Sequence, residues 1–558
     1  MQTTYLEKLE FNKIKNILSS YAKTNNGKKM CLDLYPSNNK EKVQKALDET
    51  TEAVALIYRK GNLPLETIGD ISTYILNLKN QNFLSAKALL ELATLLKTSK
   101  TLKNYYFEKE LNQTDSLTNY FDHLYTNPNI EEKIFSAIID ENTFDDRASN
   151  ALYKIRQQMR NTKKEIKNKL QSLLNSKYLQ EPIVTIRQNR FVVPVKSEYQ
   201  TEIKGFIHDT SSTGSTVFVE PISVFDLNNQ LSELKNQENI EIEKILQILS
   251  SLFFDITNEL ENNFNLITIL DFIFAKAKYS KELDCNCPKI NDDKIIYLKN
   301  AKHPLLDQNI AVPITLEIGK TFSSLLITGP NTGGKTVTLK TVGLLTTMAQ
   351  SGMHIPASSE SSIYLFDNIF ADIGDEQSIL ESLSTFSSHM THIINILNEA
   401  TSDSLVLVDE LGSGTDPIEG ASLALSILEY LKKHNITVLA TTHYHELKEY
   451  ALLTDGVENA SCEFNLETLS PTYRLLIGVP GKSNAFAISQ KLGLKQEILE
   501  NAKKSINSDT AKTEDLLKEI YDSKALIESE KEKTLQYSNK IERLKQKLEN
   551  ETTDLEEQ

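Results

Sequence analysis

The chain has 558 residues, too many for a single hydrophobic core and enough for three or four domains. Hydrophobic residues make up 40% and charged residues 25%, as in ordinary globular proteins. No apolar run approaches the roughly 18 residues that a membrane span needs, and the first residues lack the apolar block of a signal peptide. The formal net charge of -15 disfavours indiscriminate nucleic-acid binding but permits a local basic patch. These features predict a cytoplasmic protein without membrane contact.

The four cysteines are too few and too scattered for a disulfide framework. Cys285 and Cys287 form a candidate half metal site. No second Cys/His pair follows at ligand spacing, so two reduced thiols are the favoured interpretation.

The first 275 or so residues show apolar side chains at intervals of three and four, which predicts mostly helices. One stretch, 183–221, is instead rich in β-branched residues with alternating polarity, and it predicts strands around a Gly/Ser turn. We therefore expect a helical core and lever domain at 1–130, completed by 251–285. Clamp arms with a small strand-rich insertion would occupy 131–250.

From Tyr297 onward, short apolar runs alternate with helical segments, which predicts an α/β domain at 286–507. Strands are expected at 323–329, 361–366, 404–410 and 436–442, and helices at 335–350, 383–400, 419–434 and 446–451. Residues 508–558 predict a C-terminal coiled-coil or helical arm, with a weak heptad repeat at Ile520, Ile527, Thr534, Ile541, Leu548 and Leu555. The fold class is thus multidomain, α followed by α/β.

The segment "GPNTGGKT" at 329–336 is a complete P-loop between a predicted buried strand and a predicted amphipathic helix. Glycines at 329 and 334 let backbone N–H groups close around phosphates, and the helix N-terminus favours their charge. Lys335 would neutralise the β/γ phosphates and Thr336 would place a hydroxyl on Mg²⁺. The alternative, a glycine turn with an exposed lysine, does not explain this context.

About 70 residues later, the apolar strand "SLVLV" ends in Asp409 and Glu410. Carboxylates at the end of a buried strand are costly unless they are used. Asp409 would hold Mg²⁺ through water, and Glu410 would polarise the attacking water.

His443 follows another apolar strand in "LATTHYHEL". Three interpretations are open: a sensor of the γ-phosphate, a metal ligand together with His445, and a structural histidine. The two histidines lack further ligands nearby in the sequence, so the γ-phosphate sensor is favoured.

Four segments together, "GPNTGGKT", "LSTFSSHM", "LVLVDELGSGTDP" and "ATTHYHEL", resemble the MutS ATPases, an ABC-type branch of the P-loop proteins. Ser384 and Thr385 stand where ABC transporters carry an LSGGQ-like signature. Thr332, "FADIGDEQS" and "GVPGKSNAFAISQKLGL" resemble the second MutS branch, whose members suppress recombination and usually end in an Smr domain. The similarity covers about residues 5 to 505.

The resemblance implies a homodimer with two ATPase modules packed head to tail. Ser384 and Thr385 would complete the partner's site, and Gly414, Thr415 and Asp416 would line the same interface. The remaining loop residues expected to surround the nucleotide are Pro330, Asn331, Thr332 and Gly333. His303-Pro304 matches an element near the adenine. ATP and Mg²⁺ are the expected cofactors.

Two features of the MutS family have no counterpart. Mismatch-repair members carry an N-terminal module with a Phe-x-Glu wedge, whereas Phe218-Val219-Glu220 here lies mid-chain and is interpreted as coincidental. No Smr domain is recognised either, so we do not expect its nuclease chemistry. Recognition of single mismatches is therefore not predicted.

A basic patch lies in the predicted clamp arm at 153–170, where only Glu165 opposes the positive charges. Its members are Lys154, Arg156, Arg160, Lys163, Lys164, Lys167 and Lys169, and Arg187, Arg190 and Lys196 follow. Such a patch fits a phosphate backbone, although lysine-rich helix faces are also often merely solvated. Few aromatic residues interleave it, so base stacking is not indicated.

The favoured function is an ATP-hydrolysing clamp on branched or recombination-intermediate DNA. The alternative is a ribosome-associated ATPase that contacts ribosomal RNA and splits collided ribosomes, as the resemblance implies for some members. A structural organiser like the cohesion ATPases fits less well, because those have much longer coiled coils flanking a split ATPase.

Overall fold

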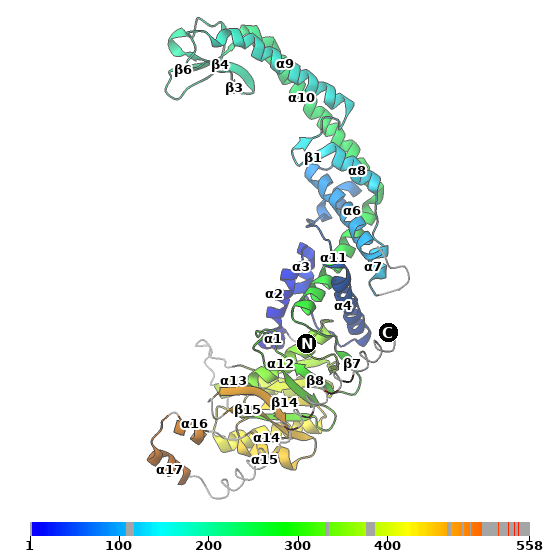
Figure 1. Cartoon of the computed structure of the whole chain (residues 1–558), viewed down its shortest axis with the longest axis vertical. Helices are drawn as coiled ribbons and strands as arrows, with labels where there is room; N and C mark the ends of the chain where they lie inside the picture. The colour runs from blue at the N-terminus through cyan, green and yellow to red at the C-terminus, as the bar shows by residue number, and fades with distance from the viewer. Residues whose placement is uncertain are drawn as a thin grey trace, which may run out of the picture.

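The computed structural model forms an elongated molecule in which an α/β domain, a helical middle part and a strand-tipped helical arm follow one another (Figure 1). It describes residues 3–107, 116–329, 334–374, 385–465, 470–481, 485–491 and 493–504, and isolated positions 523, 530, 534, 541 and 545. The predicted heptad arm therefore lies almost entirely outside the described residues.

The described chain opens with the helices α1 (Thr3–Lys8), α2 (Phe11–Tyr21), α3 (Asn25–Leu32) and α4 (Lys40–Lys60). Apolar residues of α1, of α2 and of the turn between them, including Leu9, Phe11 and Ile14, share one hydrophobic core with the strands of the α/β domain. The sequence pattern groups these residues with the lever domain, whereas their packing ties the start of the chain to the ATPase sheet. The domain limits themselves stay a prediction.

The helical middle part has a hydrophobic core of its own around α6. Its elements are α5 (Ser72–Lys79), α6 (Ala86–Phe107), α7 (Thr118–Asp122), α8 (Pro128–Ala137) and a small hairpin of β1 (Ile138–Asp140) and β2 (Thr143–Phe144). In α6, buried Leu89, Leu92 and Leu96 recur at the spacing of a helix face, as the sequence predicted.

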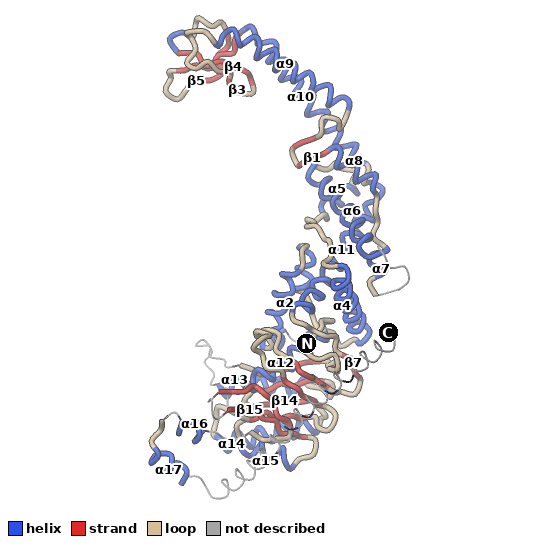
Figure 2. Tube along the Cα trace, viewed as in Figure 1, coloured by secondary structure: helices blue, strands red, loops and turns tan. Residues whose placement is uncertain are grey.

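The arm consists of two long helices, α9 (Asn150–Leu174) and α10 (Ile222–Ser251), that carry a small sheet at their far end (Figure 2). The sheet has the order β3-β4-β6-β5 and is antiparallel throughout. Its strands are β3 (Thr185–Arg187), β4 (Arg190–Lys196), β5 (Gly205–Thr210) and β6 (Thr216–Pro221), with the 3-10 turn η1 (Ser197–Tyr199). These four strands lie in the stretch 183–221, where the sequence predicts strands.

Helix α11 (Thr257–Glu282) follows the short turn η2 (Phe254–Ile256) and returns the chain from the arm to the α/β domain. Its buried Asp271 accepts hydrogen bonds from the backbone N–H groups of Lys23 and Thr24 and from the Thr24 hydroxyl, at 2.7–3.0 Å. The start of α3 is thereby fixed to α11. A side chain at Gly27 would collide with Asp271, since its Cβ would lie 2.4 Å from the carboxylate.

The α/β domain contains a six-stranded sheet of order β12-β13-β14-β10-β15-β16 and a four-stranded sheet of order β7-β11-β8-β9. In the larger sheet β12 to β15 and β10 are parallel, whereas β16 is antiparallel to β15. The larger sheet's strands are β10 (Ser324–Thr328), β12 (Asn368–Asp372), β13 (Ser404–Val408), β14 (Thr437–Thr441), β15 (Val457–Asn465) and β16 (Ser470–Ile477). The smaller sheet's strands are β7 (Lys289–Asn291), β8 (Ile296–Ala301), β9 (Ile314–Ile318) and β11 (Ser362–Tyr364).

The helices that belong to this domain or follow its sheet are α12 (Lys335–Gln350), α13 (Thr385–Glu399), α14 (Pro417–Lys433), α15 (His445–Leu453), α16 (Ala485–Lys491) and α17 (Gln496–Lys504). The four predicted strands and the four predicted helices of this region are all present as β10, β11, β13, β14 and α12 to α15. None of the helices described is long and apolar enough to cross a membrane.

Lys276 on α11 is buried, and it donates to the carbonyl oxygens of Gly352 at 3.1 Å and Ala46 at 3.4 Å. Burial lowers the pKa of Lys276 from 10.5 to about 8, because the charged form is poorly solvated there, although the charge of Glu49 opposes the shift. Between these pH values the unfolded chain binds more protons than the folded one, so this group makes folding more favourable as pH rises.

Replacing Lys276 with methionine should raise the free energy of unfolding at pH 7 by roughly 1–3 kcal/mol, because a buried charge is exchanged for an apolar group of similar length. The difference from wild type should shrink as pH rises from about 8 to 10.5. Urea unfolding at several pH values measures both effects. A variant less stable than wild type throughout would show that the ammonium contributes net stability.

Candidate active site

The P-loop frame is formed by β10, which ends at Thr328, and by α12, which begins at Lys335. Gly329 and Gly334 have φ angles of 124° and 96°, a region that side-chain-bearing residues rarely adopt. The predicted phosphate contacts Pro330, Asn331, Thr332 and Gly333 lie outside the described residues.

Lys335 is only 2% exposed, and its Nζ donates a hydrogen bond of 2.9 Å to the carbonyl oxygen of Gly329. Burial lowers the pKa of Lys335, while the negative charges of Glu410 and Asp409 oppose this shift. The ammonium therefore lies at the start of the loop, close to two carboxylates. Because water solvates this cation poorly, a phosphate bound there would interact with it strongly.

Asp409, the residue after β13, accepts a 2.6 Å hydrogen bond from the Thr336 hydroxyl and a second one from the Thr441 hydroxyl. The first contact brings together the two residues that the sequence assigned to Mg²⁺. A hydroxyl and a carboxylate are ligands of the kind that Mg²⁺ prefers, usually alongside waters. The residues present thus fit a magnesium site at this position.

Glu410 adopts a left-handed backbone conformation with φ 50°, which is uncommon outside glycine. Its N–H donates to the Thr441 hydroxyl at 2.7 Å, while the same hydroxyl donates to Asp409. The hydroxyl of Thr441, at the end of β14, therefore fixes the Asp409 carboxylate and the Glu410 backbone relative to each other. Residues forced into such a conformation are concentrated at functional sites.

Asp372 at the end of β12 is 1% exposed and was not identified from the sequence. Its carboxylate contacts Lys8 of α1 at 3.2 Å and His389 and His392 of α13 at 2.8 and 3.0 Å. Burial raises the pKa of Asp372, but the hydrogen bond from His389 and the charge of Lys8 outweigh it, so the pKa is lowered. This cluster fixes α13 beside the strand ends.

The predicted signature residue Ser384 lies outside the described residues, and Thr385 is the first residue of α13. Gly414, with φ 88°, packs against the first turn of α13, because a Cβ there would lie 3.3 Å from Phe386. Asp416 caps α14 by accepting from the N–H groups of Ile418 and Glu419. The segment that contains Gly414 and Thr415 therefore lies next to the start of α13 within one chain.

His443 is exposed on the loop after β14, and its ring lies 4.6 Å from that of Tyr444. Tyr444 is fixed by donating from its hydroxyl to the Gly412 carbonyl oxygen at 2.8 Å. His445 lies 3.4 Å from Glu449, one turn along α15. Among the described residues no group of three or more His, Cys, Asp or Glu side chains is placed to hold a metal, and Cys285 and Cys287 are free thiols.

A cavity of about 380 Å³ adjoins the P-loop frame beside Gly334 and α12. His303, Ile310, Val337 and Tyr473 are among the residues that line it. Its size and largely apolar wall suit the planar base of a nucleotide. The resemblance places His303 near the adenine, whereas Tyr473, which would contact a Cβ on Gly334 at 3.0 Å, was missed.

Comparison with known proteins matches residues 325–509 to the family model described as MutS domain V. The chain is 49% identical over 539 residues to a protein of Acetivibrio thermocellus named Endonuclease MutS2, an alignment covering 96% of this chain and 68% of that protein. The chain belongs to the MutS2 family. Proteins with the same name from Clostridium botulinum and Clostridium perfringens are 47% and 46% identical over 98% of this chain, which spans 70% of each.

Membership of the MutS2 family confirms the predicted branch of the MutS proteins and the presence of its ATPase domain. Lys335, Thr336, Asp409 and Glu410 of the described site were predicted from the sequence. Thr441 and Asp372 lie within the quoted segments "ATTHYHEL" and "FADIGDEQS", but no role was predicted for either residue. Both contact Asp409: the Thr441 hydroxyl donates to its carboxylate, and the Asp409 N–H donates to the Asp372 carbonyl oxygen at 2.8 Å.

Gly481 belongs to "GVPGKS", one of the segments that resembles the MutS2 branch, and it lies directly against the start of the P-loop. The Gly481 N–H donates to the Thr328 hydroxyl at 2.6 Å, and its carbonyl oxygen accepts from Lys448 at 2.9 Å. A Cβ on Gly481 would lie 2.7 Å from the nitrogen of Gly329.

Replacing Gly481 with alanine should therefore displace Gly329 and weaken ATP binding about tenfold or more, a loss of only about 1.4 kcal/mol. Calorimetric titration with ATP measures the affinity. Gly69→Ala is the control, because neither Gly69 nor Gly481 has a left-handed φ and a Cβ at position 69 would meet only the flexible end of the Glu91 side chain. Unchanged affinity in the Gly481 variant would show that the loop can move aside.

The basic side chains predicted to contact nucleic acid divide into two groups. The arginines are ion-paired: Arg156 with Glu238 and Asp146 at 2.7 and 2.8 Å, Arg160 with Asp146, Arg187 with Asp209, and Arg190 with Glu220. The lysines of the patch are exposed along α9, and these are Lys154, Lys163, Lys164, Lys167 and Lys169. The structure therefore leaves the lysines in solvent and engages the arginines in the arm itself.

Glu220, the acidic residue of the Phe-x-Glu sequence, is fully buried in β6. It accepts hydrogen bonds from Arg190, His208 and Asn228. Such a carboxylate cannot enter a duplex, in agreement with the interpretation of this sequence as coincidental.

Proposed function

We propose that this chain is a dimeric, ATP-hydrolysing clamp that binds branched or recombination-intermediate DNA and suppresses recombination. The observation that carries the proposal is the continuity of α11. Its residues Ala275 and Tyr279 belong to the core shared with the ATPase sheet, while Leu260 and Leu270 belong to the core of the middle part. One rigid helix can thus transmit a change at the nucleotide site to the arm.

In the proposed mechanism Lys335 binds and neutralises the terminal phosphates. Thr336 and Asp409 would hold Mg²⁺, which would supply further charge neutralisation. Glu410 orients and deprotonates the attacking water. Ser384 of the opposite subunit completes the site, so that ATP binding favours a closed dimer. Closure alters the grip of the arms, and hydrolysis resets it.

The composite site can be tested by mixing two inactive proteins, Glu410→Gln and Ser384→Arg. In a mixed dimer one site combines an intact Glu410 with an intact Ser384, so ATP hydrolysis should reappear on mixing. A mixture as inactive as its components would show that each subunit completes its own site.

The exposed lysines of α9 are the proposed contacts to the phosphate backbone. Changing Lys154, Lys163, Lys164 and Lys167 to glutamine should weaken binding to four-way junctions and flatten the dependence of log affinity on log salt by roughly one unit for each lysine–phosphate pair removed. Filter binding at several salt concentrations measures both. The control changes four exposed lysines elsewhere, Lys45, Lys97, Lys320 and Lys433, and has the same net charge.

The proposal requires a preference for four-way junctions over linear duplex at moderate salt, and equal affinities would overturn it. The alternative target is ribosomal RNA, because exposed lysines without interleaved aromatic residues suit any phosphate backbone. Sedimentation of the Glu410→Gln protein with ATP through sucrose gradients distinguishes the two. Enrichment with collided ribosomes favours the alternative, and absence from those fractions counts against it.

A further inference from the structure

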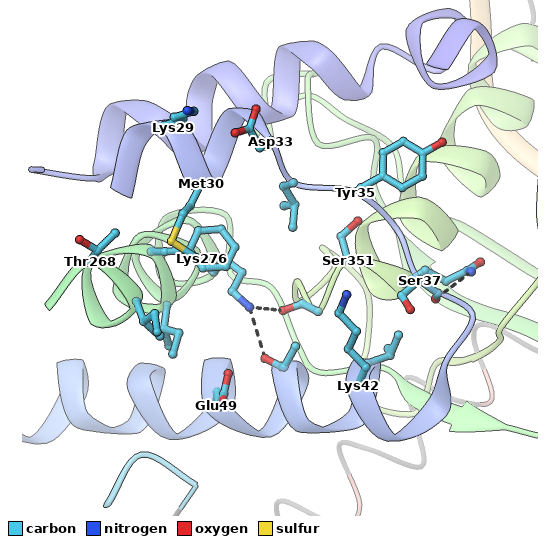
Figure 3. A pocket seen from close by; sticks show the side chains of 18 of the residues that line it. Lys29, Met30, Asp33, Tyr35, Ser37, Lys42, Glu49, Thr268, Lys276 and Ser351 are labelled. Atoms are coloured by element: carbon cyan, nitrogen blue, oxygen red, sulfur yellow. Dashed lines mark hydrogen bonds between the residues drawn. The ribbon is translucent and has the colours of Figure 1, made fainter. Parts of the chain in front are cut away.

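A cavity of about 690 Å³ lies away from the nucleotide site, where the helical core meets the ATPase domain. Its walls are α3 and the segment after it, one face of α4, one face of α11, and the C-terminal end of α12 (Figure 3). Its lining residues on α4 and on α11 recur every three or four positions along the sequence. Each helix therefore faces the cavity with one side only. The cavity has no part in the site described above.

The cavity combines an apolar wall with a few converging polar groups, which is the usual character of small-molecule sites. Met30, Val43, Ile269 and Phe272 supply apolar surface. Tyr35 at the rim is 43% exposed and is available to cover a flat group.

Lys276 reaches into this cavity from α11 and ends between α4 and the residues after α12 (Figure 3). Its ammonium has three N–H donors, and the described residues offer two acceptors, the carbonyl oxygens of Gly352 and Ala46. The Gly352 oxygen is shared with the Thr50 hydroxyl, which donates to it at 2.9 Å. Beyond these two oxygens the ammonium lies over the Phe272 ring, 5.0 Å from its centre, so among the described residues no third oxygen or nitrogen accepts from it.

The charges around the cavity favour an anion. Lys29 and Lys42 are exposed at its edge and Lys276 is inside, opposed by Asp33 and Glu49. Glu49 is already engaged, since it accepts from the Tyr120 hydroxyl at 2.7 Å and lies 3.8 Å from Lys45. This local excess of positive charge occurs in a chain whose formal net charge is -15.

The cavity is connected to the nucleotide site by a single helix. Helix α12 begins at Lys335 and ends at Gln350, whose side chain donates to the carbonyl oxygens of Ser37 and Phe366 at 3.2 and 2.8 Å. The next residues, Ser351 and Gly352, line the cavity. A ligand that shifts this end of α12 along its axis would move the P-loop lysine at the other end.

We propose that this cavity binds a small organic anion with a flat apolar body, its acidic group on Lys276 and Lys42, and that α12 couples this binding to the nucleotide site. Binding itself does not depend on the function proposed above. The coupling needs only a nucleotide that binds at Lys335.

Anilinonaphthalene sulfonate is a suitable probe, because it pairs a flat aromatic body with one negative charge and fluoresces when it leaves water. We expect one saturable site per chain in the wild-type protein. Lys276→Met should weaken the affinity at least about tenfold, the order expected for losing a hydrogen bond to a charged group. Lys42→Met, at an exposed position, should weaken it by a smaller factor without affecting folding.

Two controls separate this site from general adhesion to apolar surface. Lys281→Met changes a lysine further along α11, exposed over Tyr58 and outside the cavity, and should bind like wild type. The uncharged analogue N-phenylnaphthylamine should not distinguish wild type from Lys276→Met. Equal affinity of the sulfonate for both proteins, or binding without saturation, would overturn the proposed site.

The coupling is measured by titrating a non-hydrolysable ATP analogue calorimetrically with and without saturating probe. Coupling between two sites typically changes the affinity of each ligand about fivefold or more. The probe should change the affinity for the nucleotide by the same factor as the nucleotide changes the affinity for the probe. An unchanged nucleotide affinity would overturn the coupling. Failure of the analogue to bind even without probe would instead contradict the proposed ATPase site.

Discussion

Replacing Glu410 with glutamine should lower steady-state ATP hydrolysis by about 10²–10⁴-fold, the usual contribution of a general base, while nucleotide affinity stays close to that of wild type. Glutamine has the same shape, and the backbone bond from residue 410 to Thr441 does not depend on the carboxylate. Lys335 and the pair formed by Thr336 and Asp409 are also left intact. A phosphate-release assay and calorimetric titration with ATP measure the two quantities.

The matched control is Glu419→Gln, which changes an exposed glutamate in the first turn of α14. It should hydrolyse ATP at the wild-type rate. Normal turnover in the Glu410 variant would contradict the role assigned to this carboxylate, and loss of ATP binding would show that the carboxylate also organises the phosphate site.

Replacing Lys335 with methionine should abolish the stabilisation of the protein by ATP. A ligand present at 100 times its Kd stabilises the folded state by about 2.7 kcal/mol, so the wild-type unfolding temperature should rise clearly with ATP. Without nucleotide the variant should be at least as stable as wild type, because a buried cation with a lowered pKa is replaced by an apolar side chain. Thermal unfolding with and without ATP and Mg²⁺ measures both effects.

Lys340→Met is the control on the same helix. Its Nζ lies 3.6 Å from Glu10 rather than near the P-loop, so the ATP-dependent rise should be retained. If ATP still stabilised the Lys335 variant as strongly as wild type, the phosphates would not depend on this lysine.

Much of the catalytic site could be predicted because its signals are local. The strands β10, β13 and β14 are continuous apolar runs whose residues are all buried, and the residues after them carry the chemistry. The P-loop glycines, Asp409 and Glu410 follow directly from those strand ends. The roles of Thr441 and Asp372 could not be predicted, because they arise from contacts with residues between 17 and 364 positions away in the chain.

Strand β15 was missed for a different reason. Its sequence "VENASCEFN" contains polar residues that the fold buries, Asn459 and Ser461 among them, so it shows no apolar run. It nevertheless pairs in parallel with β10 at the centre of the nucleotide site. Tertiary context, rather than local propensity, places it there.

Counting basic residues in the sequence overestimates how many of them are available to contact nucleic acid. Arg156 looks available in the sequence, yet its partner Glu238 comes from α10, 82 residues later, and the hairpin of α9 and α10 brings them together at 2.7 Å. The same holds for Arg190 and Glu220 across the small sheet. The ion-paired arginines can be distinguished from the exposed lysines only once the pairing of distant helices and strands is known.

The most direct test of a nucleotide-gated clamp is the affinity of the Glu410→Gln protein for a four-way DNA junction, measured at one salt concentration with and without ATP and Mg²⁺. If ATP binding closes the dimer and α11 transmits this closure to the arm, the affinity should change by about tenfold or more, a coupling of about 1.4 kcal/mol. The same affinity in both conditions, with ATP shown to be bound, would contradict such a clamp.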